Sequence, residues 1–170
     1  MTNLSDFRRD KDDFLRNEPQ SPLDRDQQKS FTGLKYYPEN PSLRINLPLE
    51  KVEKPERVVM ATSTGDEQEY LKVGQIRFVV QGQEAILQVY VSVEGGEYFI
   101  PFVDATAPAE TYGAGRYLEP EDLGGGILHV DFNLAYNPYC AYNARWSCPL
   151  PPRANRLAVR IEAGEKKFHA

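Results

Sequence analysis

Apolar side chains recur at every second position over long parts of this chain, and this pattern predicts strands. It is clearest at 76–80 and 85–93, and a third apolar run covers 98–102. A two-residue period is typical of strands that bury one face. The glycine-containing turns at 81–83 and 95–96 separate the three runs, so we expect them to form a meander of hairpin-connected strands.

Shorter runs extend the prediction to about seven or eight short strands. Residues 57–62, 69–73, 127–132 and 157–162 are rich in β-branched and apolar side chains, and the proline-rich stretch 34–50 suits extended edge segments. We therefore expect a mainly β fold, an antiparallel β-sandwich or barrel with one or two short N-terminal helices.

The first helix is expected at about 6–17, with Ser5 as its N-cap. Its apolar stripe is thin, and a short polar helix is marginal alone, so Phe7 and Phe14 are expected to dock it onto the main body.

The second helix has Ser21 as a potential N-cap, Pro22 at its first position and Gly33 as a potential C-cap. We expect residues 1–170 to form a single domain, with a helical lead at 1–33 and a β body at 34–170, because chains of about this length usually form one domain.

Three segments do not fit the strand pattern: 104–119, 131–156 and 163–168. The part from Asp131 to Leu150 holds both cysteines, the single tryptophan and three of the ten tyrosines. Its asparagines and prolines interrupt any helix or strand, so we expect a loop held by its own side chains. Functional sites are often built on loops of this kind.

Composition narrows the classes of partner. The chain has 25 acidic and 20 basic residues and a net charge of −5. Nucleic acid and anionic membrane are therefore not expected as partners, because both require a concentrated basic face. We also expect no signal peptide and no membrane span, and hence a soluble, cytoplasmic protein.

The glycines at 113 and 115 allow a tight turn directly before Arg116. Two interpretations remain open for this arginine. It can form a structural ion pair with Asp104 or Asp131, or it can present its planar fork to a carboxylate or phosphate of a ligand. The glycine spacing lacks the pattern of a phosphate-binding loop, so a nucleotide cofactor is not expected.

The carboxylates of Asp104, Glu110 and Asp131 also permit a hydrolase. In that alternative Asp131 or Asp104 acts as general base, or Cys140 acts as nucleophile. Catalysis would require a perturbed pKa and a base within hydrogen-bond reach of its nucleophile.

A metal centre is not expected. Cys140 and Cys148 would have to meet His129 and His169, and the cysteine spacing is longer than zinc sites use. His129 falls on the polar side of its predicted strand. A disulfide between the cysteines stays open, although thiols are expected in a reducing compartment.

The remaining polar and aromatic residues of these loops suit a ligand pocket, with tyrosines as walls, asparagines as polar readers and Arg116 as anchor. The candidate binding residues are Tyr112, Arg116, Asp131, Asn133, Tyr136, Asn137 and Tyr142. The secondary candidates are Asp104, Glu110, Cys140 and Cys148.

Several long irregular motifs carry a family resemblance: TSTGDEQEYLKVG at 62–74, ETYGAGRYLE at 110–119, DFNLAYNPYCAY at 131–142, CPLPPRANRL at 148–157 and EAGEKKF at 162–168. Through them the chain resembles the domain-of-unknown-function family numbered 1684. It looks like a minimal version, without the additional β-rich segment that longer relatives carry ahead of this region. The resemblance implies no activity.

Three hypotheses follow. The first is a binding module for a small molecule or peptide, with the pocket between the loops at 104–119 and 131–150. The second is the hydrolase, and the third is a structural or protein-interaction domain whose loop residues satisfy one another. Oligomeric state is left open.

Overall fold

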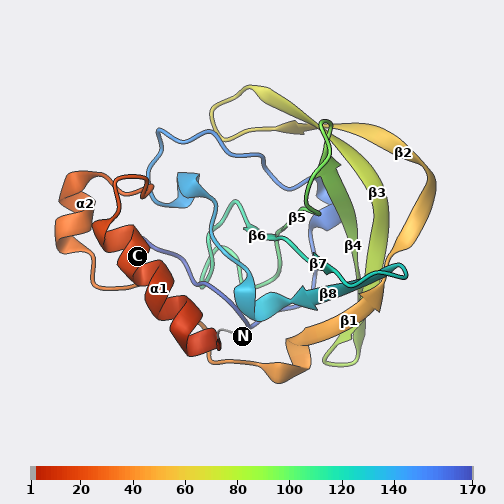
Figure 1. Ribbon diagram of the computed structural model, residues 1–170, viewed down its shortest axis with the longest axis horizontal. Coiled ribbons are helices and arrows are strands. Elements are labelled where there is room, and N and C mark those ends of the chain that lie inside the picture. The colour runs from red at the N-terminus through yellow and green to blue at the C-terminus, as the bar shows by residue number, and fades with distance from the viewer. Residues whose placement is uncertain (1–2, 170) are drawn as a thin grey trace.

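The computed structural model describes residues 3–169 of the chain (Figure 1). This part contains eight strands in three antiparallel sheets and two α-helices, which confirms the predicted mainly β fold. The sheets remain open at their edges, so the described residues form no closed barrel.

The largest sheet is a meander of three long strands in the order β2–β3–β4, and its hairpin turn lies where the sequence predicts it. Its strands are β2 (Glu50–Ala61), β3 (Glu67–Val80) and β4 (Gln83–Ser92). The runs at 69–73 and 76–80 join into the single strand β3, because a register shift at Gly74 absorbs the irregularity between them. A side chain at Gly74 would meet the Glu50 carbonyl oxygen at 2.6 Å, which explains the glycine.

A second sheet has the order β1–β8–β7 and crosses the end of the first. Its strands are β1 (Arg44–Pro48), β7 (Glu121–Asp122) and β8 (Ile127–Asp131). As the alternation predicts, Leu128, Val130 and Phe132 point into the core. His129 lies on the other side of β8 and contacts Asn46 through its Nδ1 atom at 2.7 Å.

The third strand of the predicted meander was misplaced. A single bridge, Tyr90 to Phe99, connects this run to β4, and β5 (Ile100–Phe102) pairs instead with β6 (Arg116–Leu118). All three residues of β5 are buried. The chain after the glycine turn therefore leaves the meander and enters the core, which buries more apolar surface than an edge position would.

The predicted strand at 157–162 is wrong, since no strand forms there. Its backbone is bound mainly by loops and side chains. The Leu157 amide donates to the Val103 carbonyl at 2.7 Å, and the Ile161 amide donates to Asp104 Oδ2 at 2.6 Å. These contacts replace the ladder that the β-branched sequence would otherwise form.

The first helix, α1 (Leu4–Asn17), forms where it is predicted, but Asn3 caps it in place of Ser5. The Asn3 side chain accepts a hydrogen bond from the Asp6 amide at 2.8 Å. The docking prediction is confirmed for Phe14, which packs against the cluster of Leu15, and is wrong for Phe7, which remains 41% exposed. Leu15, which the prediction omitted, is the buried side chain of α1.

The second helix is shorter than predicted. It is α2 (Arg25–Ser30), and its N-cap is Asp24, which forms a capping box with Gln27. Ser21 is buried and donates instead to the Leu15 carbonyl at 2.8 Å, so it holds the end of α1. The helix ends before Gly33 because Phe31 turns inward to join Leu15 in a small cluster.

The buried apolar residues form two clusters. The large one lies between the sheets and includes Ile76, Leu87 and Phe132, which are each 0% exposed. The small one joins Leu15, Leu23, Phe31 and Tyr142, and so connects both helices to the 131–150 loop. In Figure 1 the helices stand on the side of the molecule opposite the long sheet, with the loop beside them.

The loops are ordered by short 3-10 helices and internal hydrogen bonds. These helices are η1 (Pro41–Leu43), η2 (Phe132–Leu134), η3 (Tyr139–Ala141) and η4 (Arg153–Asn155). The irregular character predicted for the 131–150 loop is therefore confirmed. Among residues 3–169 no helix is both long and apolar enough to cross a membrane.

Candidate functional site

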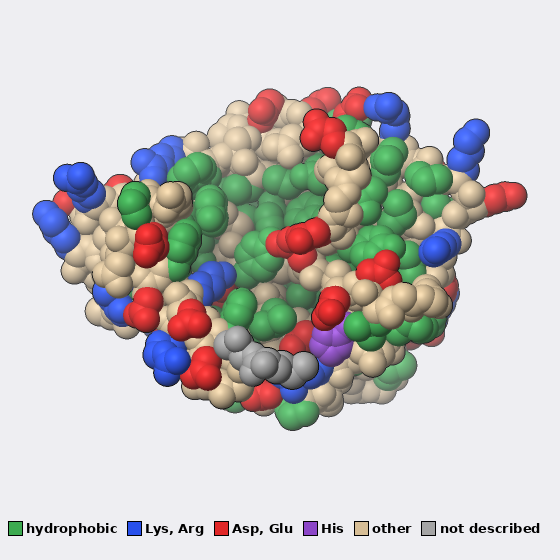
Figure 2. Space-filling view, in the orientation of Figure 1, with side chains coloured by type: hydrophobic (Ala, Val, Ile, Leu, Met, Phe, Trp, Pro, Cys, Tyr) green, Lys and Arg blue, Asp and Glu red, His purple; other side chains and the backbone are tan. Residues whose placement is uncertain are grey.

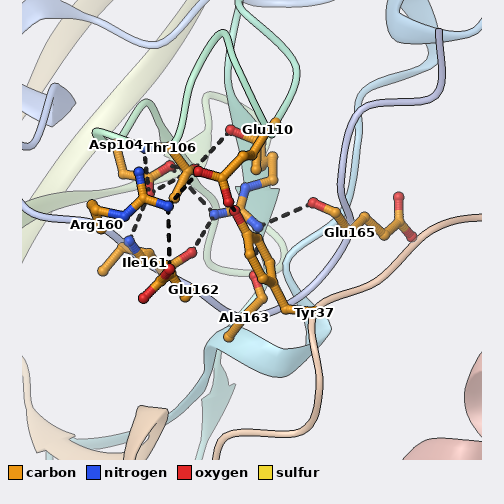
Figure 3. Close-up of polar contacts among 11 residues, drawn as sticks. Tyr37, Asp104, Thr106, Glu110, Arg160, Ile161, Glu162, Ala163 and Glu165 are labelled. Atoms are coloured by element: carbon orange, nitrogen blue, oxygen red, sulfur yellow. Dashed lines mark hydrogen bonds and ion pairs between the residues drawn. The ribbon is translucent and has the colours of Figure 1, made fainter. Parts of the chain in front are cut away.

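Arg116 opens strand β6 and is the most deeply buried charged side chain of the two predicted loops, with 1% exposure. Its NH1 atom donates to the carbonyls of Ala163 and Glu165, and its NH2 atom donates to the Ile161 carbonyl at 3.0 Å. Burial lowers its pKa, while the charge of Asp104 opposes that shift. Figure 3 shows its partners Asp104, Ile161, Ala163 and Glu165, three of which belong to the C-terminal segment.

Asp104 completes the enclosure. Its Oδ1 atom lies 3.3 Å from the Arg116 NH2 atom, and its oxygens accept from the Thr106 hydroxyl and the Ile161 amide. Protein groups thus surround both members of the pair. This arrangement corresponds to the structural ion pair, although the buried Arg116 Nε atom has no hydrogen-bond partner within residues 3–169.

Asp131 and Asn133 serve a different junction. Asp131 Oδ2 accepts from Arg44 Nε at 3.1 Å, and its Oδ1 atom accepts from the Asn133 amide at 3.0 Å. The Asn133 side chain in turn bonds both backbone groups of Asn40. These residues therefore fasten the chain before β1 to the end of β8, and Asp131 does not reach Arg116.

Glu110 lies closer to the surface than Asp104. It accepts from the Tyr37 hydroxyl at 2.9 Å and pairs with Arg160. The hydrogen bond from Arg160 is the main reason that the pKa of Glu110 is lowered.

Glu165 joins several segments of the fold, and the sequence patterns did not identify it. It is 3% exposed and forms an ion pair with Lys11 of α1. Its Oε1 atom also accepts from the Asn137 amide at 2.9 Å and from the Tyr142 hydroxyl at 3.1 Å. One carboxylate thus joins the helix to the 131–150 loop. The sequence signal that could have identified Glu165 was its place in the stretch 163–168, which does not fit the strand pattern.

Between α1 and the 131–150 loop lies a groove of about 690 Å³, called here the aromatic groove. Helix α1 supplies one wall and the loop supplies the other, while Tyr117 and Glu119 come from the region of β6. Its apolar lining residues include Phe7, Phe14, Leu15, Tyr117, Pro138, Tyr139, Tyr142 and Trp146. Phe7 and Tyr139 keep 41% and 40% of their surface exposed, so apolar faces remain open to solvent.

The centre of the aromatic groove combines rings with charged groups. The Lys11 ammonium lies 5.1 Å from the ring centre of Tyr136, and Tyr136 meets Tyr117 edge-on at 5.8 Å. The Tyr136 hydroxyl donates to Glu119. Burial raises the pKa of Tyr136, so the hydroxyl remains a donor.

A second cleft of about 730 Å³ begins on the other side of Glu119. It is lined by the irregular part of β2, the 95–98 turn and the acidic stretch 119–122. Glu97 lies beside Glu119 there, and the neighbouring Glu119 carboxyl group raises the pKa of Glu97. Figure 2 shows a broad apolar hollow with acidic side chains across its middle.

The sequence-predicted candidates thus fall into separate groups. The aromatic groove contains Tyr136, Asn137, Tyr142 and Cys148. Arg116 and Asp104 form the buried ion pair, and Asp131 and Asn133 lie at the β1–β8 junction. Tyr112 contacts Cys140. Residue types alone did not identify Lys11 and Glu119, because their importance arises from contacts distant in sequence.

Asn137 has a further feature. Its Nδ2 atom donates to the Lys166 carbonyl at 3.0 Å, whereas its buried Oδ1 atom has no hydrogen-bond partner within residues 3–169. Buried acceptors usually have partners. This oxygen belongs to a residue that lines the aromatic groove.

Cys140 and Cys148 are both free thiols and lie side by side. Across the part of the chain that the structure describes, no three His, Cys, Asp or Glu side chains form a group suited to a metal ion. His169 contacts the Tyr142 carbonyl at 3.2 Å.

The fold and the site define a mainly β protein with a buried ion pair, Arg116 with Asp104, beside an aromatic groove. Residues 29–166 match the family model described as "Protein of unknown function (DUF1684)", so the chain belongs to this family. A search of curated proteins found no match.

Among solved structures, the chain is similar to the solution NMR structure of an uncharacterized protein from Haloarcula marismortui. The two chains are 37% identical, with a TM-score of 0.72, and the match covers 96% of this chain and 91% of the other.

Proposed function

We propose that the protein binds a small molecule in the aromatic groove between α1 and the 131–150 loop. The observation that carries this proposal is a set of rings whose polar ends are held by the protein while apolar surface faces the groove. Trp146 donates through Nε1 to the Pro22 carbonyl at 3.0 Å, and the Tyr136 hydroxyl donates to Glu119. Such rings are already positioned, so binding costs little side-chain entropy.

Charge indicates which ligand would fit. The positive charge of Lys11, which lies beside the Tyr136 ring, is neutralised by Glu165. Asp10 and Glu119 add negative charge to the lining of the groove. Glu97 lies beyond Glu119. A flat apolar or aromatic group carrying a positively charged end complements these walls. Its ring would pack against Tyr139 and Trp146, and its cation would lie near Glu119, where carboxylate and aromatic rings both favour it.

The hydrolase alternative receives less support. Asp104 is enclosed by Arg116, Thr106 and Ile161, so it faces no open substrate site. Asp131 lines a small depression of about 200 Å³, but its oxygens already accept from Arg44 and Asn133. Neither carboxylate is within hydrogen-bond reach of a serine or cysteine nucleophile among the contacts of residues 3–169.

Binding can be tested with matched probe pairs. Phenethylamine and tryptamine are compared with 3-phenylpropionate and indole-3-propionate by NMR chemical-shift perturbation and Trp146 fluorescence. We expect the amines to shift resonances of the aromatic groove saturably and the acids to bind at least about tenfold more weakly, a difference of about 1.4 kcal/mol.

Two variants locate the site. Tyr139→Ala should weaken amine binding, because it removes an exposed wall of the groove, whereas Leu134→Ala should not, because Leu134 is equally exposed outside it. Glu119→Gln should reduce the preference for amines over acids. If no probe perturbs the groove, or if Leu134→Ala has the same effect as Tyr139→Ala, the proposal is wrong and a structural or interaction role is favoured.

A further inference from the structure

Cys148 lines the aromatic groove, and Cys140 lies beside Cys148. Cys148 Sγ accepts a hydrogen bond from the Cys140 amide at 3.3 Å, and the Tyr112 hydroxyl donates to Cys140 Sγ at 3.4 Å. Cys140 is half-buried, while Cys148 is 7% exposed. Cys140 is therefore the more exposed residue of the pair.

Both cysteines are held in position by other parts of the chain. The Cys148 amide donates to Ser63 Oγ at 3.0 Å, and the Cys148 carbonyl accepts from the Ser63 amide at 2.9 Å. Cys140 lies in η3. The ring of Tyr139, also in η3, packs against the ring of Trp146, and the two ring centres are 5.2 Å apart. The two sulfurs thus meet because two anchored segments bring them together.

The hydrogen bonds distinguish the roles of the two thiols. A hydrogen bond from Cys148, followed by bonds from Tyr112 and Ser63, lowers the pKa of Cys140 to about 6. The same contact with Cys140 raises the pKa of Cys148. These contacts favour the thiolate form at Cys140 and the thiol form at Cys148.

We propose that Cys140 and Cys148 form a peroxide-reactive dithiol, in which Cys140 is oxidised first and Cys148 then closes a reversible disulfide. In the first step the Cys140 thiolate attacks one oxygen of a hydroperoxide. The S–O bond forms and the O–O bond breaks, giving a sulfenic acid at Cys140, and the leaving oxygen takes a proton from solvent to become an alcohol or water.

In the second step Cys148 sulfur attacks Cys140 sulfur. The S–S bond forms, the S–O bond breaks, and the oxygen leaves as water with the proton of Cys148. Overall the peroxide gains two electrons and the dithiol loses them. An external dithiol reductant restores both thiols by exchange.

The site is supported by geometry that a pair of unrelated buried cysteines would lack. Tyr112 supplies a donor to the Cys140 sulfur, Cys140 is the more exposed cysteine, and Cys148 adjoins it. Trp146 lies between the two cysteines in sequence and contacts Tyr139, so its fluorescence reports closure of the pair.

The test uses the reduced full chain treated with hydrogen peroxide at neutral pH. Thiol titration and mass spectrometry should show loss of both thiols and of two hydrogen atoms per chain, with a Cys140–Cys148 cross-link in the peptide map. Cys148→Ser should accumulate a sulfenic acid at Cys140 that dimedone traps. Cys140→Ser should react at least about tenfold more slowly than the wild type.

Tyr112→Phe provides a variant that keeps both cysteines. It should retain disulfide formation but react more slowly and require a higher pH, because one donor to the thiolate is lost. Circular dichroism checks that each variant is folded. If Cys140→Ser fails to fold, competitive alkylation of the wild type identifies the more reactive cysteine instead.

The proposal fails if Cys148 is the residue that is alkylated or oxidised first. It also fails if peroxide gives intermolecular disulfides alone, or if both thiols survive peroxide concentrations that oxidise free cysteine. None of these outcomes bears on binding in the aromatic groove, which is measured separately on reduced protein.

Discussion

The carboxylate of Asp104 and the guanidinium of Arg116 lie 3.3 Å apart, with side chains that are 2% and 1% exposed. The pair connects the loop after β5 to the start of β6. Through the carbonyls of Ile161, Ala163 and Glu165 it also holds the C-terminal segment. A buried pair of this kind positions the chain, and its loss leaves an uncompensated charge in the core.

Arg116→Met should therefore lower the free energy of unfolding by about 3–5 kcal/mol, because Asp104 remains buried and three carbonyls lose their donor. Urea denaturation of both proteins measures the change. Arg116→Lys should not restore stability, since an ammonium lacks the planar fork that reaches several carbonyls. The control is Arg160→Met, whose pair with Glu110 is 40% and 37% exposed and should contribute far less to stability, because solvent screens it. Equal losses in Arg116→Met and Arg160→Met would contradict this account.

Gly115 should not tolerate alanine. Its φ is +103°, and a side chain would meet the Phe102 carbonyl oxygen at 2.5 Å. We expect Gly115→Ala to cost more than about 2 kcal/mol, since backbone strain and displacement of Arg116 add to each other. Gly95→Ala is the matched control, because Gly95 has φ +85° and open space around it. Its cost should stay near about 1 kcal/mol, as measured by thermal or chemical denaturation.

Glu165→Gln should loosen the contact between α1 and the 131–150 loop. Glutamine retains an acceptor for the Asn137 amide and the Tyr142 hydroxyl but loses the charge that pairs with Lys11. The expected loss is about 1–3 kcal/mol, with faster hydrogen exchange at the Asn137 amide. Glu162→Gln, an exposed partner of Arg160, should change neither quantity appreciably. Unchanged exchange at Asn137 would show that Glu165 is not the connection.

Amine binding in the aromatic groove should depend on pH through Glu97. The neighbouring Glu119 carboxyl group raises the pKa of Glu97, so Glu97 keeps its proton to a higher pH than an isolated glutamate does. A cationic probe binds better once that proton is lost. Affinity for phenethylamine should thus rise as pH increases through the Glu97 titration and then level off, as measured by calorimetry. Glu97→Gln should remove this dependence, and affinity that falls with rising pH would contradict it.

Alkylation of Cys140 by iodoacetamide should reach its half-maximal rate near pH 6, because its pKa is lowered to about 6. An ordinary cysteine reaches this point near about pH 8.5. The sign follows from the thiolate, which is the reactive form and persists to lower pH when hydrogen bonds stabilise it. Peptide mapping after brief labelling gives the rate at each cysteine. A midpoint above about pH 8 at Cys140 would contradict the hydrogen-bond geometry.

Local patterns were sufficient for part of the fold. The alternation at 76–80 and 85–93, with the turn between them, identified the hairpin of β3 and β4 because period-two patterning and turn residues act over a few positions. Composition likewise identified the 131–150 loop as irregular. Cap assignments failed where two potential caps were close in sequence, as with Asn3 and Ser5.

Local sequence patterns were sufficient to predict the mainly β class, the existence of both helices and the position of the unusual loop, because each depends on neighbouring residues. The tertiary structure decided that Arg116 pairs with Asp104, that residues 157–162 bind side chains in place of a strand, and that α1 closes the aromatic groove. These outcomes depend on burial and on partners far along the chain. Desolvation makes such contacts energetically decisive, and no local pattern records which partner a buried charge will find.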